Sequence, residues 1–387
     1  MPDCDDTGEN APTMTAISVL RKKIVLLPGD GIGPEVTRAA AGVLGVCASA
    51  GGHHFEFREY PFGGAGIDAS NEPLPSATLE ACLHSDAVLL GAVGGPRWDA
   101  RPPGQRPESG LLALRKELGL YINLRPIRLR PSLAGISPLR PERIGRIDIE
   151  IVRELAGGIY FGERGIEGRE GSERAWDLET YTTGEIERVA RYAFVRAEER
   201  AKKLASVDKA NVLASSALWR RTVTQLAAEH PVVKLEHLYV DNAAMQLVLA
   251  PGQFDVLVTS NMFGDILSDA AAALVGSIGL IPSMSCGSGP SLYEPIHGSA
   301  PTLAGKDMAC PIGSILSAAM LLRESFGLGA EAAWIESALD RILSEGIRTV
   351  DIAQPGSTVV GCREFTERLK SEIMTVAQPK AGKGRSA

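Results

Sequence analysis

In LLPGDGIGPEV, residues Leu26–Val36, three glycines follow directly on a run of apolar residues. An apolar strand that enters a glycine-rich turn and then a helix is typical of α/β proteins. The turn does not match the dinucleotide-binding fingerprint G-x-G-x-x-G, because Gly29, Gly31 and Gly33 simply alternate. Asp30 also places a carboxylate where it would repel phosphate. The sequence therefore predicts a tight strand-to-helix turn near an active site, and not a pyrophosphate site.

Short apolar runs alternate with longer amphipathic stretches from residue 23 onward, which indicates an α/β protein with helices packed on a sheet. GGIYFGERG is one of the predicted strands and is also a candidate hairpin arm. The predicted strands are KIVLLP (23–28), FEFREYPF (55–62), DAVLLGAVG (86–94), RIDIEIVREL (146–155), GGIYFGERG (157–165), SVDKANV (206–212), VKLEHLYVD (233–241) and FDVLVTS (254–260). The predicted helices include residues 33–52, 107–119, 185–204, 261–274, 312–327 and 332–346.

The composition is that of a globular protein with a substantial core: 387 residues, 44% hydrophobic and 22% charged. This length predicts two domains or one large domain. The net charge of −7 argues against broad binding to nucleic acid or anionic membranes, although a local arginine cluster can still hold an anionic substrate. No apolar run approaches the length of a membrane span.

The cysteines and the chain ends point to a cytoplasmic location. The six cysteines are scattered and form no CxxC pair, so the sequence predicts free thiols and neither a zinc site nor a disulfide framework. The acidic N-terminal segment fits neither a secretory signal nor a transit peptide. We expect disordered ends at about 1–20 and 376–387.

Two aspartates in NMFGDILSDAAAAL suggest a metal site. Asp265 and Asp269 are four residues apart and so share one face of a helix. Paired carboxylates suit a hard divalent cation such as Mg²⁺ or Mn²⁺. The alternative is a helix start that carries acids because they favour its dipole.

A second helical stripe, in PESGLLALRKELG, begins in a carboxylate and ends in a guanidinium. Glu108, Leu111, Leu112 and Arg115 follow one another at helical spacing. Two leucines alone would indicate a core face, but buried charges need partners. The stripe therefore predicts a pocket wall for a ligand with a branched aliphatic group and a carboxylate.

Several further residues are candidates whose convergence the sequence cannot establish. Arg125 and Arg153 are set in apolar, strand-like segments and could complete a clamp for a dicarboxylate, or form structural ion pairs. Lys209 lies in a mostly apolar strand, where desolvation would favour its neutral, basic form. Tyr160 lies beside glycines, Asp241 ends a strand, and His297 lies in a long Gly- and Pro-rich loop.

Taken together, these motifs resemble the isocitrate/isopropylmalate dehydrogenase family of β-decarboxylating dehydrogenases, from about Lys23 to residue 349. The resemblance rests on eight motifs in the family's order. They are LPGDGIGPEV, GAVGGPRWD, LLALRKELGLYINLRP, IVRELAGGIYFGE, SVDKANVL, YVDNAAMQL, SNMFGDILSD and YEPIHGSAP.

The resemblance implies a two-domain α/β fold with a large twisted mixed sheet that is not a Rossmann fold. The first, cofactor-side domain would combine 1–120 with 276–387. The second domain, 121–275, would carry the metal and substrate site and mediate dimerisation. In this family the acid/base lysine and one metal-binding aspartate reach the site from the partner subunit, so the resemblance implies a homodimer with shared active sites.

Residue roles also follow from the resemblance. Tyr160 and Lys209 would be the acid/base pair, and Asp241, Asp265 and Asp269 the metal ligands. Substrate would contact Arg115, Arg125, Arg153, Asp241, Glu108, Leu111, Leu112 and Val212. The cofactor would contact Ile32, Glu294, His297, Gly298, Ser299, Ala300, Pro301, Thr302 and Cys310.

Two positions depart from the family pattern in the cofactor loop. Thr302 replaces an aspartate that would bind the adenosine ribose, and Cys310 replaces the asparagine before Pro311. Because no basic residue takes over at 302 or 303, NAD remains favoured over NADP.

The implied reaction is the oxidative decarboxylation of 3-isopropylmalate to 4-methyl-2-oxopentanoate with Mg²⁺ or Mn²⁺ and NAD, in leucine biosynthesis. A hydrocarbon-lined pocket favours an isopropyl group over a third carboxylate. The alternatives are a related enzyme for another 3-alkylmalate, tartrate, isocitrate or homoisocitrate, and a non-catalytic regulatory subunit. Regulatory subunits typically lose metal or acid/base residues, and this chain keeps them.

Overall fold

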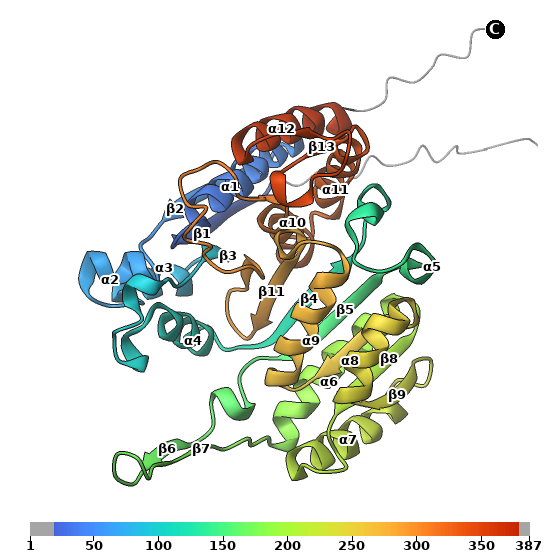
Figure 1. The fold of residues 1–387 in the computed structure, drawn as a ribbon. Coiled ribbons are helices and arrows are strands. Elements are labelled where there is room, and N and C mark those ends of the chain that lie inside the picture. The colour runs from blue at the N-terminus through green and yellow to red at the C-terminus, as the bar shows by residue number, and fades with distance from the viewer. Residues whose placement is uncertain (1–18, 379–387) are drawn as a thin grey trace, which may run out of the picture.

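The apolar run before the glycine turn forms strand β1 (Arg21–Gly29), which is buried on both faces. Side chains alternate across a strand, so Ile24 and Leu26 join one apolar cluster while Val25 and Leu27 join another. Burial on both faces explains why this strand is continuously apolar instead of alternating. The computed structural model describes residues 19–378 and confirms an α/β fold built on one large mixed sheet (Figure 1).

Ten strands of the described part of the chain form this sheet, in the order β2-β1-β3-β12-β11-β4-β5-β10-β8-β9. Besides β1, the sheet contains β2 (His54–Glu59), β3 (Ala87–Ala92), β4 (Leu120–Arg128), β5 (Asp148–Glu154), β8 (Lys203–Asp208), β9 (Lys234–Tyr239), β10 (Val256–Thr259), β11 (Pro282–Gly287) and β12 (Leu292–Pro295). Two small pairs stand apart, β6 (Arg164–Glu167) with β7 (Arg174–Asp177) and β13 (Ile347–Arg348) with β14 (Thr358–Val359).

The pairing divides the sheet into two parallel ends joined by an antiparallel centre. Strands β2, β1, β3 and β12 are parallel, and so are β5, β10, β8 and β9. Strand β4 is antiparallel to both of its neighbours, β11 and β5, and β11 is antiparallel to β12. This antiparallel centre is absent from a Rossmann sheet and was not predicted from the residue pattern.

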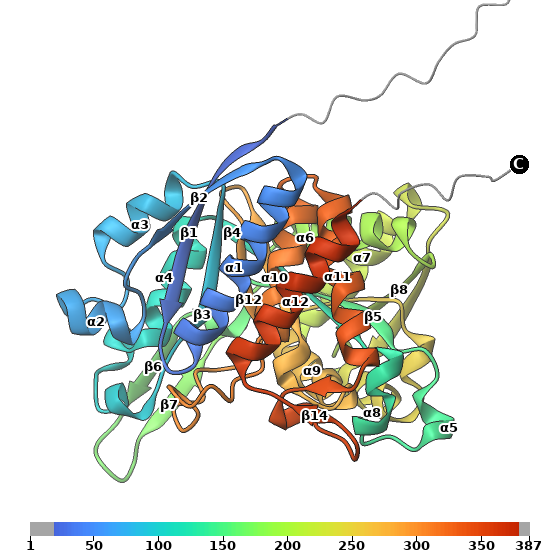
Figure 2. The same cartoon turned by 90° about the horizontal axis from the view of Figure 1, so that it is seen from above.

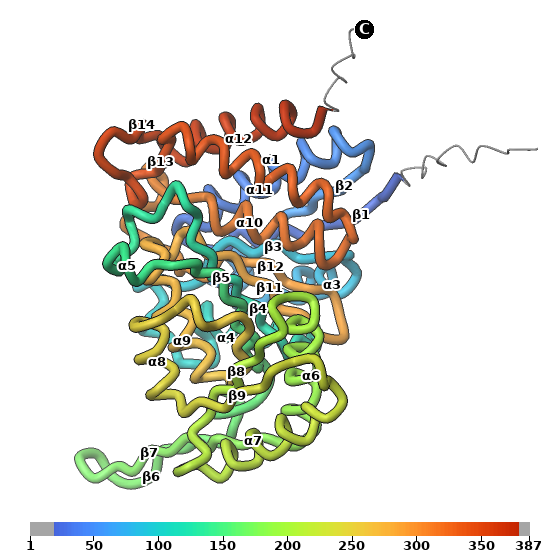
Figure 3. Tube along the Cα trace, turned by 90° about the vertical axis from the view of Figure 1, so that its right-hand side faces the viewer, coloured from blue at the N-terminus to red at the C-terminus, as the bar shows by residue number. Residues whose placement is uncertain are grey.

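Helices cover both faces of the sheet and pack in two groups. Helices α1, α10, α11 and α12, from opposite ends of the chain, lie side by side (Figures 1 and 2). The middle of the chain occupies the other end of the molecule (Figure 3). The helices are α1 (Gly33–Gly51), α2 (Gly64–Ser70), α3 (Ser76–Leu83), α4 (Pro107–Glu117), α5 (Pro141–Ile144), α6 (Thr183–Glu199), α7 (Ala214–Leu226), α8 (Val240–Leu249), α9 (Asn261–Leu274), α10 (Ile312–Met320), α11 (Gly329–Ser344) and α12 (Cys362–Ala377). None of them is long and apolar enough to cross a lipid bilayer.

Three predictions about elements need correction. Residues 157–163 do not form a strand, because Gly158 has φ +74° and Gly158–Tyr160 form a 3₁₀ turn, whereas Arg164 and Gly165 begin β6. The hairpin arm suggested for this region does exist as β6 and β7, and it projects from the body of the molecule (Figure 1). Strand β8 ends at Asp208, so Lys209 follows the strand instead of lying within it.

The third correction concerns the predicted disorder at the C-terminal end. Helix α12 continues to Ala377, beyond the predicted boundary at 376, because Leu369 and Ile373 on one face of the helix are anchored in the main core. The remainder of both predicted disordered ends, residues 1–18 and 379–387, lies outside the described residues.

Candidate functional site

The glycine turn uses its backbone amides for contacts within the protein. The amide of Asp30 donates to Ala92 O at 2.8 Å, that of Ile32 to Ser299 O at 2.8 Å, and that of Gly33 to Asp30 O at 2.9 Å. A Cβ on Gly31 would lie 1.9 Å from Ser299 O, so only glycine permits this close approach. The turn therefore seats the start of α1 against two loops, which agrees with the prediction that it is not a pyrophosphate site.

The helical stripe of α4 lies beside the core and not in it. Leu114 and Leu118 are the core residues of this segment, whereas Leu111 and Leu112 are half-buried. Arg115 donates from Nη2 to Glu294 Oε1 at 2.8 Å, and both side chains are 11% exposed. The buried Nε of Arg115 has no acceptor among residues 19–378. A half-exposed apolar wall that ends in an unsatisfied donor is the arrangement expected of a ligand pocket.

Two arginines converge on the first aspartate of the predicted metal pair. Arg125 Nη2 lies 3.3 Å from Asp265 Oδ1, and Arg153 Nη1 bonds to the same oxygen. Arg125 Nη1 lies 3.4 Å from Asp269 Oδ1. Burial lowers the pKa of Arg125 and of Arg153, the latter to about 10, and the charge of Arg115 also lowers both. The structure thus brings the three predicted arginines and the two aspartates of α9 together.

Polar side chains that sequence reasoning did not single out hold these arginines in place. Asn261, at the first position of α9, accepts from Nε and Nη2 of Arg153 at 3.0 and 2.8 Å. Asn123 accepts from Nε of Arg125 at 2.7 Å, and Ser268 accepts from its Nη1 at 2.6 Å. The position of Asn123 inside a buried strand was the available signal, because a fully buried amide needs partners.

Asp265 and Asp269 have different electrostatic surroundings. Burial alone would raise the pKa of Asp265, but Arg153 and Arg125 hold it below its ordinary value. Burial raises the pKa of Asp269, whose side chain is 58% exposed and is opposed mainly by Arg125. Asp265 is therefore held as an anion, and Asp269 offers a partly open carboxylate one helical turn away.

Tyr160 completes this cluster from the 3₁₀ turn after β5. Its hydroxyl donates to Asp265 Oδ2 at 3.0 Å, and the Arg153 guanidinium lies 5.7 Å from the ring centre. Burial, followed by the charge of Asp265, raises the pKa of the Tyr160 hydroxyl. Buried Glu154 shapes the turn by accepting the amides of Ala156 and Gly157 at 2.9 and 2.8 Å.

Lys209 and Asp241 form a separate pair. Lys209 Nζ lies 2.5 Å from Asp241 Oδ1, and the two side chains are 28% and 67% exposed. Lys209 is therefore not the desolvated strand residue that the sequence predicted, because it follows the end of β8 beside an acid. No hydrogen bond or ion pair within residues 19–378 joins this pair to the arginine cluster.

The sheet explains the separation within one chain. Arg153 is on β5, Lys209 follows β8, and Asp241 follows β9 at the edge of the sheet. At roughly 4.8 Å between neighbouring strands, β5 lies about 10 Å from β8 and about 14 Å from β9. No three acidic, histidine or cysteine side chains in the described part of the chain lie together as metal ligands. Asp241 is therefore not grouped with Asp265 and Asp269 as a third metal ligand within the described chain.

Among the predicted cofactor residues, Glu294 lies within β12, Ile32 is in the glycine turn, and the others are on the segment after β12. Ile32 is buried against Ala300 and Leu303, and Thr302 and Pro301 are exposed. His297 is 8% exposed, and its Nε2 has no partner within residues 19–378. Gly298 is exposed and Ser299 is buried. The side chain of Cys310 belongs to the main core, so it does not line the open side of the loop.

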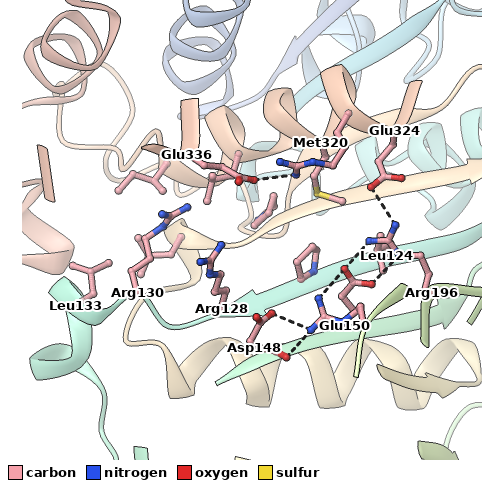
Figure 4. A pocket seen from close by; sticks show the side chains of 17 residues that line it. Leu124, Arg128, Arg130, Leu133, Asp148, Glu150, Arg196, Met320, Glu324 and Glu336 are labelled. Atoms are coloured by element: carbon pink, nitrogen blue, oxygen red, sulfur yellow. Dashed lines mark hydrogen bonds and ion pairs between the residues drawn. The ribbon is translucent and has the colours of Figure 1, made fainter. Parts of the chain in front are cut away.

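A cavity of about 230 Å³ lies on the reverse face of β4 and β5 and contains none of the predicted site residues. Leu124 and Glu150 line it, and they alternate with Arg125 and Ile151 along the two strands. Figure 4 shows Arg196 between Glu150 and Glu324, to which it bonds at 2.7 and 3.4 Å. The charged side chains that line this cavity are largely paired with one another. They link secondary-structure elements, and the cavity is not the candidate site.

Comparisons with known proteins identify the family. The family profile described as isocitrate/isopropylmalate dehydrogenase matches residues 23–369. The chain is 55% identical over 354 residues to the 3-isopropylmalate dehydrogenase of Geobacillus kaustophilus, covering 91% of this chain and 95% of that protein. It is 54% identical over 352 residues to the 3-isopropylmalate dehydrogenase of Gloeobacter violaceus, covering 90% and 97%.

A solved structure has the same fold as this chain. The isocitrate dehydrogenase of Methylococcus capsulatus superposes with a TM-score of 0.81 and 32% identity, over 91% of this chain and 99% of that chain. The relatives thus match along nearly the whole length of the chain, and the family profile includes every predicted site residue. The chain therefore belongs to the isocitrate/isopropylmalate dehydrogenase family.

Proposed function

We propose that the chain is a metal- and NAD-dependent dehydrogenase that oxidises and decarboxylates 3-isopropylmalate to 4-methyl-2-oxopentanoate, a step of leucine biosynthesis in the cytoplasm. The observation that carries this proposal is the convergence of Arg125 and Arg153 on Asp265, close enough to Arg115 for its charge to act on the same carboxylate, beside the half-buried leucines of α4. The relatives named 3-isopropylmalate dehydrogenase support the same substrate.

The substrate would be held by its two carboxylates and its isopropyl group. Guanidinium groups bind carboxylates through paired hydrogen bonds, and Arg115 has a buried Nε still without an acceptor in the described chain. Leu111 and Leu112 offer an apolar wall for the isopropyl group. A third carboxylate at that wall would lack polar partners, which argues against isocitrate.

The residues present fit a hard divalent cation. Asp265 and Asp269 offer carboxylate oxygens from one helix face, and a partner subunit's Asp241 would add a third ligand. When bound, Mg²⁺ or Mn²⁺ polarises the 2-hydroxyl and the carbonyl that forms from it. Asp265 is suited to this because Arg153 and Arg125 keep it ionised despite its burial.

The residues present also fit a dinucleotide. His297 carries a buried ring nitrogen without a partner in the described residues, on a loop whose Gly298 and Thr302 are exposed. NAD accepts the hydride from C2 of the substrate. Neither Thr302 nor Leu303 offers a positive charge for a 2′-phosphate, so we favour NAD over NADP.

Lys209 and Tyr160 would move the protons. In this chain the hydrogen bond from the Lys209 ammonium lowers the pKa of Asp241. Lys209 would accept the proton of the 2-hydroxyl in its neutral form, after passing its own proton to Asp241 or to water. Tyr160 would donate a proton to the carbon that has lost CO₂. Its raised pKa supports this role because the hydroxyl stays protonated at neutral pH.

A homodimer would bring Lys209 and Asp241 to the arginine cluster of the other subunit. Exposed apolar residues lie on α8 and α9, the helix that carries Asp265, including Met245, Val248 and Ile266, which are 50–58% exposed. Val212, three residues after Lys209, is 69% exposed. A partner that covers these residues would close the site. We assign these exposed apolar residues to a dimerisation domain formed by residues 121–275. Residues 1–120 and 276–387 would form the domain that binds the cofactor.

Steady-state kinetics test the proposed function. The purified chain with Mg²⁺ should turn over 3-isopropylmalate with a higher kcat/KM than isocitrate, homoisocitrate or tartrate, and NAD should be preferred to NADP. Preference for a tricarboxylate would overturn the substrate assignment, and absence of turnover by the chain alone would favour a regulatory subunit.

Lys209→Met tests the assigned base. It should reduce kcat by at least about 10²-fold while thermal unfolding is unchanged. Lys203→Met, at the exposed start of the same strand, is the matched control and should retain wild-type rates. Equal activity of the two variants would remove Lys209 from the mechanism.

A further inference from the structure

Asp30, in the middle of the glycine turn, is a buried carboxylate that binds three backbone amides. Its Oδ2 accepts from Gly64 N and from Gly94 N, each at 2.8 Å, and its Oδ1 accepts from Ala65 N at 2.9 Å. The residue is 4% exposed. One side chain therefore connects the β1–α1 turn, the start of α2 and the loop after β3.

These segments form two walls of the candidate site. Glu108 lies against the loop after β3, since a Cβ on Gly94 would approach its Oε1 to 2.4 Å. On the other side, the turn donates from Ile32 N to Ser299 O, on the loop assigned to the dinucleotide. Asp30 thus lies where the substrate wall at Glu108 meets the dinucleotide loop at Ser299.

The charge of Asp30 is costly and is not offset by a cation. No lysine, arginine or histidine forms an ion pair with it in residues 19–378, and Asp68 adds a repulsive charge. Burial raises its pKa, although the amides of Gly64, Gly94 and Ala65 oppose this shift. A buried anion satisfied only by amides fixes the positions of those amides closely, because each lost bond leaves the charge less compensated.

Asparagine cannot reproduce this arrangement although it has the same shape. Its single carbonyl oxygen could serve Gly64 and Gly94, but its NH₂ group would then face the N–H of Ala65. The alternative orientation would place the NH₂ group against the other two amides. Asp30→Asn therefore loosens the junction with little change in volume.

We propose that Asp30 is a positioning residue that sets the distance between the substrate wall and the dinucleotide loop, and so the distance of hydride transfer. The inference rests on the proposed function in taking these two loops as the substrate and dinucleotide sides. The arginines and the dinucleotide loop each hold their own ligand, so we expect binding to change less with this distance than the rate of hydride transfer does.

The test compares Asp30→Asn with Asp86→Asn as a matched control. Asp86 also accepts a backbone amide, that of Lys23 at 2.7 Å, but it lies before β3, at the opposite end of the strand from Gly94. Asp30→Asn should lower kcat at least about tenfold while both KM values stay within about threefold. The primary isotope effect with substrate deuterated at C2 should rise, because hydride transfer becomes slower relative to the other steps.

The control should lose thermal stability without either kinetic change. Equal kcat values for Asp30→Asn and the wild type, or equal losses of kcat in both variants, would overturn the proposal. If Asp30→Asn does not fold, Ala65→Pro tests the same junction, because proline in the first turn of α2 removes the amide that donates to Asp30 Oδ1 while Asp30 and Glu108 remain, and it should lower kcat in the same way.

Failure of the proposed function is distinguishable from failure of this inference. A wild-type chain that does not turn over 3-isopropylmalate refutes the substrate assignment alone. The Asp30 comparison is then made with isocitrate, homoisocitrate or tartrate, whichever of these the wild type oxidises, with the same expected results.

Discussion

At the scale of single residues, the candidate site depends as much on neutral amides as on charged groups. Arg153 is 3% exposed and carries a charge that burial disfavours. Asn261 accepts two hydrogen bonds from Arg153 through its Oδ1 and donates from Nδ2 to Gly157 O at 3.0 Å. Its backbone amide donates to Tyr181 Oη at 2.9 Å. Asn261 therefore couples the arginine to the turn that carries Tyr160.

Replacing Asn261 should weaken both the fold and substrate binding. Asn261→Ala removes the one oxygen that accepts two hydrogen bonds from a buried guanidinium, which should cost about 1–3 kcal/mol of unfolding free energy. We expect the KM for 3-isopropylmalate to rise about tenfold because the guanidinium group of Arg153 loses its fixed orientation. Denaturant unfolding and steady-state kinetics measure the two effects.

The conservative change Asn261→Asp is the control for that experiment. It keeps the acceptor for Arg153 and loses only the donor to Gly157 O, so it should restore most of the substrate affinity. A wild-type KM in Asn261→Ala would mean that Asp265 alone orients Arg153.

The identities of the charged residues could be read from the sequence, but their pairing could not. Helical spacing placed Asp265 and Asp269 on one face and aligned Glu108 with Arg115. The partnership of Arg115 with Glu294 joins residues 179 positions apart, which no local pattern encodes. The environment of Lys209 was misjudged because its neighbour Asp241 comes from a different strand end.

At the scale of elements, α6 links the middle of the chain to its C-terminal part across the reverse face of the sheet. Arg196 near the end of α6 bonds to Glu150 on β5 at 2.7 Å and to Glu324 at 3.4 Å. Glu324 lies in the π-helical turn Leu321–Ser325 that continues α10. These bonds cross between segments that are far apart in sequence, as Figure 4 shows for the labelled side chains.

A double-mutant cycle should separate the two bonds of Arg196. Arg196→Met should reduce the unfolding free energy by about 3 kcal/mol, because Glu150 is 7% exposed and loses its main partner. Glu324→Gln should cost less than about 1 kcal/mol, since its contact is longer and partly solvated. The coupling between the two changes should also stay below about 1 kcal/mol.

Kinetics of the same variants supply the contrast. The network is on the face of β4 and β5 opposite to the arginine cluster, so both KM values should remain within about twofold of the wild type. A large rise in KM with unchanged stability would mean that this network controls the site instead of joining the elements.

Most helices and most parallel strands were predictable because their periodicity is local. Helix α6 follows this rule: Thr182 and Glu185 form a capping box at its start, and one face is fully buried. Strands β11 and β12 were not predicted, because PSMSCG and LYEP are short and their pairing with distant β4 and β3 stabilises them. The predicted strand at 157–165 failed because Glu154 caps a turn there.

For the molecule as a whole, the central question is how the Lys209–Asp241 pair comes to act with the arginine cluster around Asp265. The sheet keeps Lys209 and Asp241 about two and three strand spacings from Arg153 in one chain. The described chain does not itself join the candidate acid/base lysine to the arginine cluster, and the proposed dimer would supply that contact. The shared site was expected from the family resemblance alone. No residue pattern predicted it, because contacts between two copies leave no periodic signal in the sequence.

Mixing two inactive variants tests this shared site. Lys209→Met and Arg153→Met should each be nearly inactive as homodimers. After denaturation and joint refolding, a mixed dimer contains one site with both residues intact and one site with neither. Random pairing makes half of the dimers mixed, so the mixture should recover roughly a quarter of the wild-type activity.

A site built from one chain alone predicts a different recovered activity. If Lys209 and Arg153 of the same chain served one site, every site in the mixed dimer would lack one of them, and the mixture would stay inactive. Met245→Glu, on the exposed apolar face of α8, provides the companion measurement by light scattering. A charge there should shift the chain toward monomers. Activity should fall in proportion to dimer content and recover at higher protein concentration, because each site needs groups from both copies.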